Sequence, residues 1–261
     1  MPLDLAPVLS EARPIVERAA EVYLAHTQQW LVGLLLQGSA LKGGVIPGCS
    51  DIDFQLYLEA EAFSEAGTLP LDLCLAIQRD LAPIDPAPFG YIQCYAYPGK
   101  LPDDQVGPVP GAYHLLAGSL PVEEATADQV VESARNRLSQ LVPEPAYISK
   151  NMLEHGAGKL ARTVRYLCTD VWPTLYHVLT LQQEQEEPLA VWRLPRQEAI
   201  ALAPLDTPLS LAIHRFDDAL RLYYPAQTNA DAALEAIAAG VAFLTAAKQW
   251  WGETYGGWRF D

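Results

Sequence analysis

The chain has 261 residues, of which 50% are hydrophobic and 19% are charged, and 32 Asp and Glu outnumber 17 Lys and Arg to give a net charge of −15. This composition is typical of a globular protein and excludes an intrinsically disordered chain. The acidic balance argues against duplex DNA as a dedicated partner, because binding to a phosphate backbone needs a basic surface. A small cationic ligand or a metal-bound nucleotide fits this charge better.

No membrane span and no export signal are expected. The apolar run at residues 30–36 has the length of a strand, and residues 1–6 lack a basic segment followed by a hydrophobic one. The cysteines are far apart in the sequence and form no CxxC pair: they are Cys49, Cys74, Cys94 and Cys168. Such spacing is typical of free thiols in a reducing compartment, and we therefore expect a cytoplasmic protein.

The first third of the chain alternates between helical and strand patterns. Apolar residues recur at helical spacing over residues 15–23, behind Pro14, which suits a first helical turn. The continuous apolar run at residues 31–36 predicts a buried strand, which leads through a Gly-Ser pair into a short helical stretch at residues 40–42. Glycines and a proline within residues 43–50 predict a loop.

Apolar and polar side chains then alternate along residues 51–58, which predicts a strand with one buried face. Its core face is expected to carry Ile52, Phe54, Leu56 and Leu58, and its other face Asp51, Asp53, Gln55 and Tyr57. A helix is predicted over residues 71–81, and two more strands at residues 89–97 and 112–116.

From about residue 126 onward the pattern is helical. Ser149 is expected to cap a long helix that Pro173 ends or kinks, and two further helices are expected to follow Thr207 and Asn229. We therefore expect a mixed α/β domain at residues 1–122 and a helical domain at residues 123–261.

One group of residues in the first domain is suited to binding phosphate and a metal ion. Gly38-Ser39 lies at the turn from a strand to a short helix, where backbone amides and the Ser39 hydroxyl can donate to phosphate oxygens. Asp51 and Asp53 follow after eleven residues and lie on the same face of the next strand, where their oxygens suit a hard divalent cation. A metal would relieve the repulsion between the two carboxylates.

The full pattern comprises Gly38-Ser39, Gly43, Pro47-Gly48-Cys49-Ser50 and Asp51-Ile52-Asp53-Phe54. Taken together, it resembles the signature of the nucleotidyltransferase superfamily. That superfamily includes DNA polymerase beta, the kanamycin and streptomycin adenylyltransferases and many minimal bacterial nucleotidyltransferases. The resemblance implies an α+β fold in which a small mixed sheet with helices on one face precedes an all-α C-terminal domain. It also implies that a nucleoside monophosphate is transferred from a Mg²⁺-bound nucleoside triphosphate, with ATP expected, to a hydroxyl group.

By the same matching, Gly38 and Ser39 would hold the triphosphate, and Asp51 and Asp53 would bind Mg²⁺ as catalytic residues. The family usually carries a third carboxylate on a later strand, opposite the aspartate pair. In the predicted strand at residues 89–97, this position is held by Gln93, which cannot act as a general base. Ile92, Cys94 and Ala96 are expected on the core face of that strand, and Phe89, Tyr91, Gln93, Tyr95 and Tyr97 on the side of the site.

Glu154, expected early in the long helix, is the candidate for the missing catalytic carboxylate, although a solvated glutamate on a helix face is the commoner explanation for such a residue. Lys159 and Arg162 share a helix face and are candidates for binding the triphosphate, as is Lys42, but each is also explained as an ordinary surface cation. The tyrosines at 91, 95 and 97 are candidates for stacking on a base or acceptor ring, or for packing at a domain interface.

Three functions remain open at this point. The first is a nucleotidyltransferase that modifies a hydroxyl of a small molecule, with a cationic, aminoglycoside-like acceptor suited to an acidic protein. The second is a nucleotide-binding or interaction module on the same fold that has lost turnover, which Gln93 favours. The third is a protein-modifying adenylyltransferase, which differs only in its acceptor.

Overall fold

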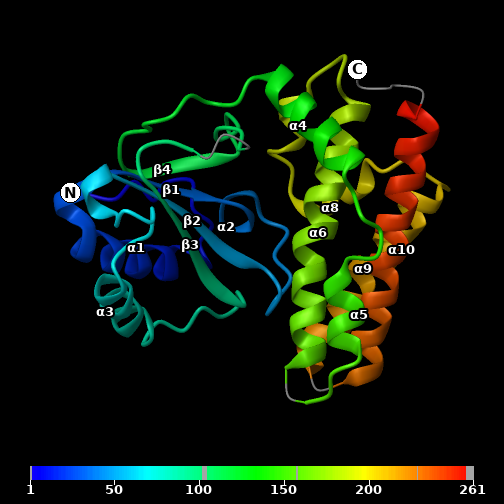
Figure 1. Cartoon of the computed structure of the whole chain (residues 1–261), viewed down its shortest axis with the longest axis horizontal. Coiled ribbons are helices and arrows are strands. Elements are labelled where there is room, and N and C mark those ends of the chain that lie inside the picture. Colours follow the sequence, from blue (N-terminus) through cyan, green and yellow to red (C-terminus); the bar gives the residue numbers. More distant parts are fainter. Residues whose placement is uncertain (1, 102–104, 157, 228, 257–261) are drawn as a thin grey trace. The chain divides into compact units, whose positions relative to one another are not determined.

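The computed structural model describes residues 2–101, 105–156, 158–227 and 229–256 of the chain. It divides into two compact units, Met1–Thr126 and Ala127–Asp261 (Figure 1). The structure places the boundary after Thr126, whereas the sequence pattern predicted it after residue 122. The chain is of the α+β class, with a mixed sheet in the first unit and helices in the second.

The first unit is built on a four-stranded sheet. Its strands are β1 (Leu31–Gln37), β2 (Asp51–Leu58), β3 (Tyr91–Tyr97) and β4 (Tyr113–Gly118), in the order β3-β2-β1-β4. β1 runs antiparallel to both β2 and β4, whereas β2 and β3 are parallel. Parallel neighbours need a crossover connection, and α3 (Leu71–Leu81) supplies it between β2 and β3. All four predicted strands and the predicted helix at residues 71–81 are confirmed.

The core of the first unit lies on the face of the sheet that α1 (Arg13–Thr27) and α3 cover (Figure 1). The predicted alternation along β2 is confirmed, because its core-face residues Ile52, Phe54, Leu56 and Leu58 are buried in this cluster. Tyr23 of α1 packs edge-on against Phe54, with ring centroids 5.3 Å apart. The apolar residues of β2 therefore face the helices, and its polar residues lie on the other face of the sheet.

The expected orientation of Phe89 is wrong. Phe89 is 3% exposed and belongs to the core cluster rather than to the polar face. It lies outside β3, in a turn where its N–H donates to the Pro86 carbonyl, so the strand alternation does not extend to it.

The second unit is helical. Its helices are α4 (Ala127–Ser139), α5 (Ala146–Met152), α6 (Lys159–Gln182), α7 (Pro188–Val191), α8 (Arg196–Ala201), α9 (Pro208–Tyr223) and α10 (Ala230–Tyr255). The two predicted helix starts are confirmed, and both are capped: the Thr207 hydroxyl accepts from the Ser210 N–H at 3.2 Å, and Asn229 Oδ1 accepts from the Ala232 N–H at 3.1 Å. The remaining short elements of the chain are α2 (Ser39–Lys42) and three 3₁₀ turns at Gln28–Trp30, Ala60–Ala62 and Tyr224–Ala226.

One expectation for the second unit is wrong, and one of the two alternatives given for Pro173 is wrong. Ser149 lies inside α5 instead of capping a long helix, and α6 begins only at Lys159, after Gly158 with a positive φ of 79°. Pro173 does not end α6, which continues to Gln182. This proline faces solvent while neighbours such as Trp172 and Leu175 are buried, so tertiary packing holds the helix on both sides of it.

α10 qualifies the expectation that the chain has no membrane span. That expectation rested on residues 30–36, but residues 236–247 form a longer uncharged run. Among the described residues, α10 is long and apolar enough to cross a membrane, with a mean hydropathy of 1.5 over its best window, 44% of which is buried. α10 packs along α9 and α6, and the core helix of a globular unit has the same length and composition.

Candidate functional site

The turn after β1 lies directly against the side chain of Asp53. Gly38 follows the last residue of β1 with φ 74° and ψ −152°, a conformation that is essentially restricted to glycine. A Cβ atom built at Gly38 would lie 2.5 Å from Asp53 Oδ2. Glycine therefore meets two requirements here: it allows the turn, and it allows the turn to approach the carboxylate.

Ser39 ties the same turn to the other aspartate. Its Oγ donates to the main-chain carbonyl of Asp51 at 3.2 Å. The short helix α2 begins at Ser39 and includes Lys42, and Gly43 closes it by donating its N–H to the Ser39 carbonyl at 3.0 Å. The structure thus brings together the four residues Gly38, Ser39, Asp51 and Asp53.

The loop before β2 is held by a set of hydrogen bonds. Ser50 is 1% exposed, and its Oγ accepts from the Ile46 N–H at 2.9 Å. The Gly48 N–H donates to the Pro88 carbonyl at 2.8 Å, and the Gly90 N–H donates to the Ser50 carbonyl at 2.7 Å. The loop is therefore fixed to the segment that enters β3, and this fixes the start of β2 at Asp51. The positioning roles of Ser50 and Gly90 were not predicted, although Pro47-Gly48-Cys49-Ser50 stood out in the sequence.

Neutral amides lie on both sides of Asp53. In the register of the sheet, Asp53 is opposite Gln37 of β1 and opposite Gln93 of β3. Adjacent strands are about 4.8 Å apart, so Gln93 is an immediate neighbour of the aspartate. Gln93 Oε1 accepts from the Tyr91 hydroxyl at 2.9 Å. The position opposite the aspartate pair is therefore neutral, as the sequence predicted.

Farther along this face the sheet is aromatic. The rings of Tyr57 and Tyr97 are 5.6 Å apart, and burial raises the pKa of both hydroxyls. The Tyr97 hydroxyl also donates to Gln105 at 3.2 Å. Tyr57 and Tyr97 therefore pack against each other, and Tyr97 is held by a further hydrogen bond. Tyr95 is 56% exposed and is the candidate on this face for stacking on a ligand.

The remaining predicted residues belong to the second unit. Glu154 lies in the connection between α5 and α6 rather than on a long helix, and its carboxylate forms an ion pair with Lys159. Hydrogen bonding and charge from Lys159 lower the pKa of Glu154 below its ordinary value. Arg162, one turn into α6, donates from Nε to the Tyr166 hydroxyl at 2.9 Å. Lys159 thus pairs with Glu154 and Arg162 with Tyr166, within the second unit, whereas the aspartate pair belongs to the first unit.

The described residues contain no group of three or more His, Cys, Asp or Glu side chains arranged to hold a metal ion. Asp51 and Asp53 are two carboxylates on one strand, both half-buried. Mg²⁺ is commonly held in this way, by one or two carboxylates together with substrate phosphates and water. In comparisons with known proteins, no family model matches the sequence and no curated protein matches it.

Proposed function

We propose that the protein is a nucleotidyltransferase that moves a nucleoside monophosphate, AMP in the first instance, from a Mg²⁺-bound triphosphate to a hydroxyl of a small molecule. The observation that carries this proposal is the approach of Gly38 to Asp53, where a Cβ would lie 2.5 Å from Oδ2. A turn built from a conformation essentially restricted to glycine, closed against a carboxylate of the next strand, suits a ligand that carries both phosphate and metal. The resemblance of the sequence motif supports the same chemistry.

The residues present fit a magnesium-bound triphosphate. Asp51 and Asp53 offer hard oxygen ligands from one strand face, and they would hold Mg²⁺ together with phosphate oxygens. Bound Mg²⁺ neutralises charge on the phosphates and on the attacking oxygen. The backbone of Gly38 and Ser39 would position the triphosphate beside the aspartates, since no side chain at position 38 stands between them.

The proposed transfer depends more on the positioning of the reactants than on a covalent intermediate with the protein. Phosphoryl-type transfer is accelerated mainly by alignment and charge stabilisation. Gln93 hydrogen-bonds with Tyr91 and cannot take the proton of the acceptor hydroxyl. The aspartates of β2, the turn at Gly38 and the bound metal therefore supply the larger part of the rate enhancement. The acceptor that suits a chain of charge −15 is cationic, such as an aminoglycoside.

One observation favours a second candidate, a nucleotide-binding module without turnover. Gln93 occupies the neighbouring strand position beside Asp53, where a carboxylate would complete the metal site. Such a module binds the nucleotide with Mg²⁺ but releases no pyrophosphate, so binding and turnover measured on the same sample separate the two candidates.

The experiment that tests the proposal is thermal unfolding with ATP or GTP, each with and without Mg²⁺. A ligand at 100 times its dissociation constant stabilises the folded state by about 2.7 kcal/mol, which raises the Tm by several degrees. We expect this shift in the wild type and its loss in Asp51→Asn and Asp53→Asn. Glu65→Gln removes an exposed carboxylate elsewhere in the same unit and should keep the shift. No nucleotide-dependent shift in the wild type, or an equal shift in both aspartate variants, would refute the proposal.

A further inference from the structure

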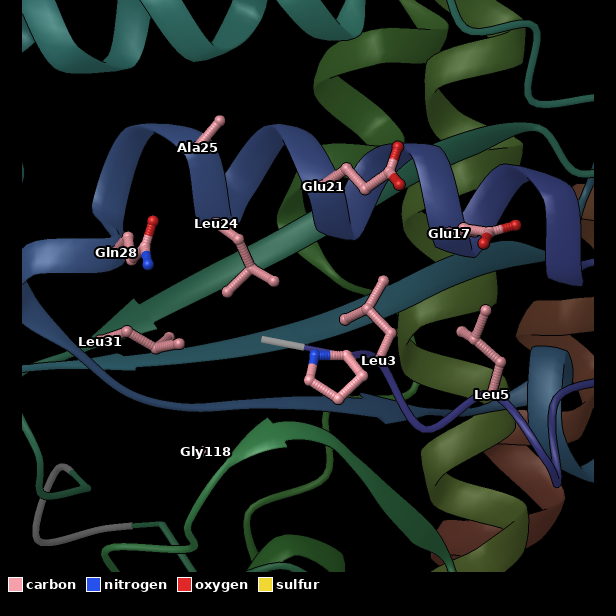
Figure 2. A pocket seen from close by; sticks show the side chains of 10 residues that line it. Leu3, Leu5, Glu17, Glu21, Leu24, Ala25, Gln28, Leu31 and Gly118 are labelled. Carbon is pink, nitrogen blue, oxygen red and sulfur yellow. The ribbon is translucent and has the colours of Figure 1, made fainter.

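The first unit contains a cavity that lies away from the proposed transferase site. It has a volume of about 660 Å³ and lies between the N-terminal segment, α1, and the ends of β1 and β4 (Figure 2). Leu31, at the start of β1, lines it, whereas Gln37, at the other end of the strand, is opposite Asp53. At about 3.4 Å per residue, the two ends of the strand are about 20 Å apart. A ligand in this cavity would therefore not contact the aspartate pair.

The lining combines an apolar body with an acidic rim. Half-buried leucines form the apolar part: Leu3, Leu5, Leu24 and Leu31. Figure 2 shows Leu3, Leu24 and Leu31 around the space beneath α1, and Glu17 and Glu21 along α1 at its edge. Among the described residues, no Lys, Arg or His lines the cavity. The volume lies within the range of about 300–1,000 Å³ typical of sites for small molecules.

The N-terminal wall is fixed to the sheet. The Asp4 N–H donates to the Leu116 carbonyl of β4 at 2.9 Å, and the Asp4 carbonyl lies 2.9 Å from Nε2 of His114. These bonds hold Leu3 and Leu5, on either side of Asp4, in place along the cavity. The cavity is thus bounded by a strand-anchored segment on one side and by a helix on the other.

Two glutamates on one face of α1 line the cavity. Glu17 and Glu21 are four residues apart on this helix, the spacing at which side chains are neighbours. Both side chains are exposed, and within the described part of the chain neither forms a hydrogen bond or an ion pair. The charge at the rim is therefore available to a ligand, and only a positive group complements it.

We propose that this cavity binds a small organic cation with an apolar body, an aryl- or alkylammonium compound. The apolar body lies among the leucines, where its burial contributes about 25 cal/mol per Å². The ammonium group lies at the rim between Glu17 and Glu21. This proposal is independent of the transferase function, because the cavity shares no residue with the site at Gly38 and Asp53.

Calorimetric titration with three probes that share an indolylethyl group tests the proposal: tryptamine, its uncharged analogue tryptophol, and the anion indole-3-propionate. We expect tryptamine to bind at least fivefold more tightly than tryptophol, and indole-3-propionate not to bind. Glu17→Gln/Glu21→Gln should abolish the preference for the amine, whereas the control Glu61→Gln/Glu65→Gln, on exposed positions outside the cavity, should keep it.

Charge reversal provides a gain-of-function readout in a folded variant. Glu17→Lys/Glu21→Lys should bind indole-3-propionate and no longer bind tryptamine, and circular dichroism confirms folding. No binding of tryptamine to the wild type at millimolar concentration, equal binding of tryptamine and tryptophol, or an unchanged preference in the glutamine variant would overturn the proposal.

Discussion

Gly38 lies in the turn after β1 and Asp53 lies in β2, yet a Cβ atom at Gly38 would lie 2.5 Å from the carboxylate oxygen Oδ2 of Asp53. The backbone of Gly38, with φ 74°, is in a region that L-residues rarely adopt. Gly43 has nearly the same backbone, with φ 83° and ψ −161°, but nothing lies within 4 Å of the position that a methyl group would take there. Alanine substitutions at the two glycines therefore distinguish the effect of backbone strain, which both cause, from the effect of a clash with Asp53, which only the one at Gly38 causes.

Gly38→Ala and Gly43→Ala should both reduce the free energy of unfolding, by about 1–3 kcal/mol, because each forces an alanine into a conformation suited to glycine. Only Gly38→Ala should abolish the nucleotide-dependent rise in Tm, since only its methyl group displaces the Asp53 carboxylate. Urea denaturation and thermal unfolding with Mg²⁺–ATP measure the two effects. Equal nucleotide shifts in the two variants would show that the approach of Gly38 to Asp53 has no role in binding.

Gln93→Asp should lower the Mg²⁺ concentration needed for half of the nucleotide-dependent Tm shift. The substitution adds a carboxylate on the strand next to Asp53, opposite it in register, where metal binding relieves the added repulsion. Gln93→Asn is the matched control, because it has the same length as the aspartate without the charge. If the aspartate and asparagine variants respond identically to Mg²⁺, position 93 does not face a metal site. A gain of pyrophosphate release in Gln93→Asp alone, from a wild type without turnover, would instead favour the inactive binding module.

Glu154→Gln should leave turnover nearly unchanged, whereas loss of a general base costs about 10²–10⁴-fold in rate. Lys159 binds the Glu154 carboxylate and lowers its pKa, which weakens it as a base. Lys159→Gln breaks the same ion pair from the other side and should have an equally small effect. A drop of more than tenfold in kcat for Glu154→Gln, without one for Lys159→Gln, would restore Glu154 as the catalytic base.

His177 should make the second unit less stable in mild acid. Burial, with a smaller effect of the nearby Arg137, lowers its pKa from 6.5 to about 4, and its Nδ1 is buried without a hydrogen-bond partner among the described residues. The unfolded chain therefore takes up a proton below pH 6.5 that the folded chain takes up only near pH 4. Stability is full above pH 6.5 and falls as the pH is lowered, by about 2 kcal/mol at pH 5.

Urea denaturation at pH 7.5 and pH 5 measures this loss. Tryptophan fluorescence is a suitable signal, because five of the six tryptophans belong to the second unit. His177→Gln should flatten the pH dependence, and the exposed His214→Gln should not. Equal pH dependence in His177→Gln and the wild type would contradict the assignment.

Elements with strong local signals were predicted well from the sequence. The alternation from Asp51 to Leu58 defined β2 and its core face, and the side-chain oxygens of Thr207 and Asn229 marked the starts of α9 and α10. The aspartate pair and the Gly-Ser turn came together because β1 and β2 are neighbouring antiparallel strands, so that the end of β1 lies beside the start of β2.

The errors arose where longer-range packing overrides local pattern. Phe89 alternates in the sequence with the residues of β3, but the hydrogen bonds of its turn direct it into the core. Pro173 is tolerated inside α6 because buried neighbours hold the helix on both sides. The closeness of Gly38 to Asp53 depends on strand register and turn geometry, which no residue pattern specifies to a fraction of an ångström.

Following the phosphorus atoms of ATP tests the proposed transfer of a nucleoside monophosphate most directly. The wild type is incubated with Mg²⁺ and cationic hydroxyl acceptors such as kanamycin or streptomycin, using ATP labelled with ³²P at either the α or the γ position. We predict that the α label appears on the acceptor with release of pyrophosphate, and that Asp53→Asn reduces this rate by about 100-fold or more. Transfer of the γ label to the acceptor, or an unchanged rate of α-label transfer in Asp53→Asn, would contradict the proposed nucleotidyltransferase activity.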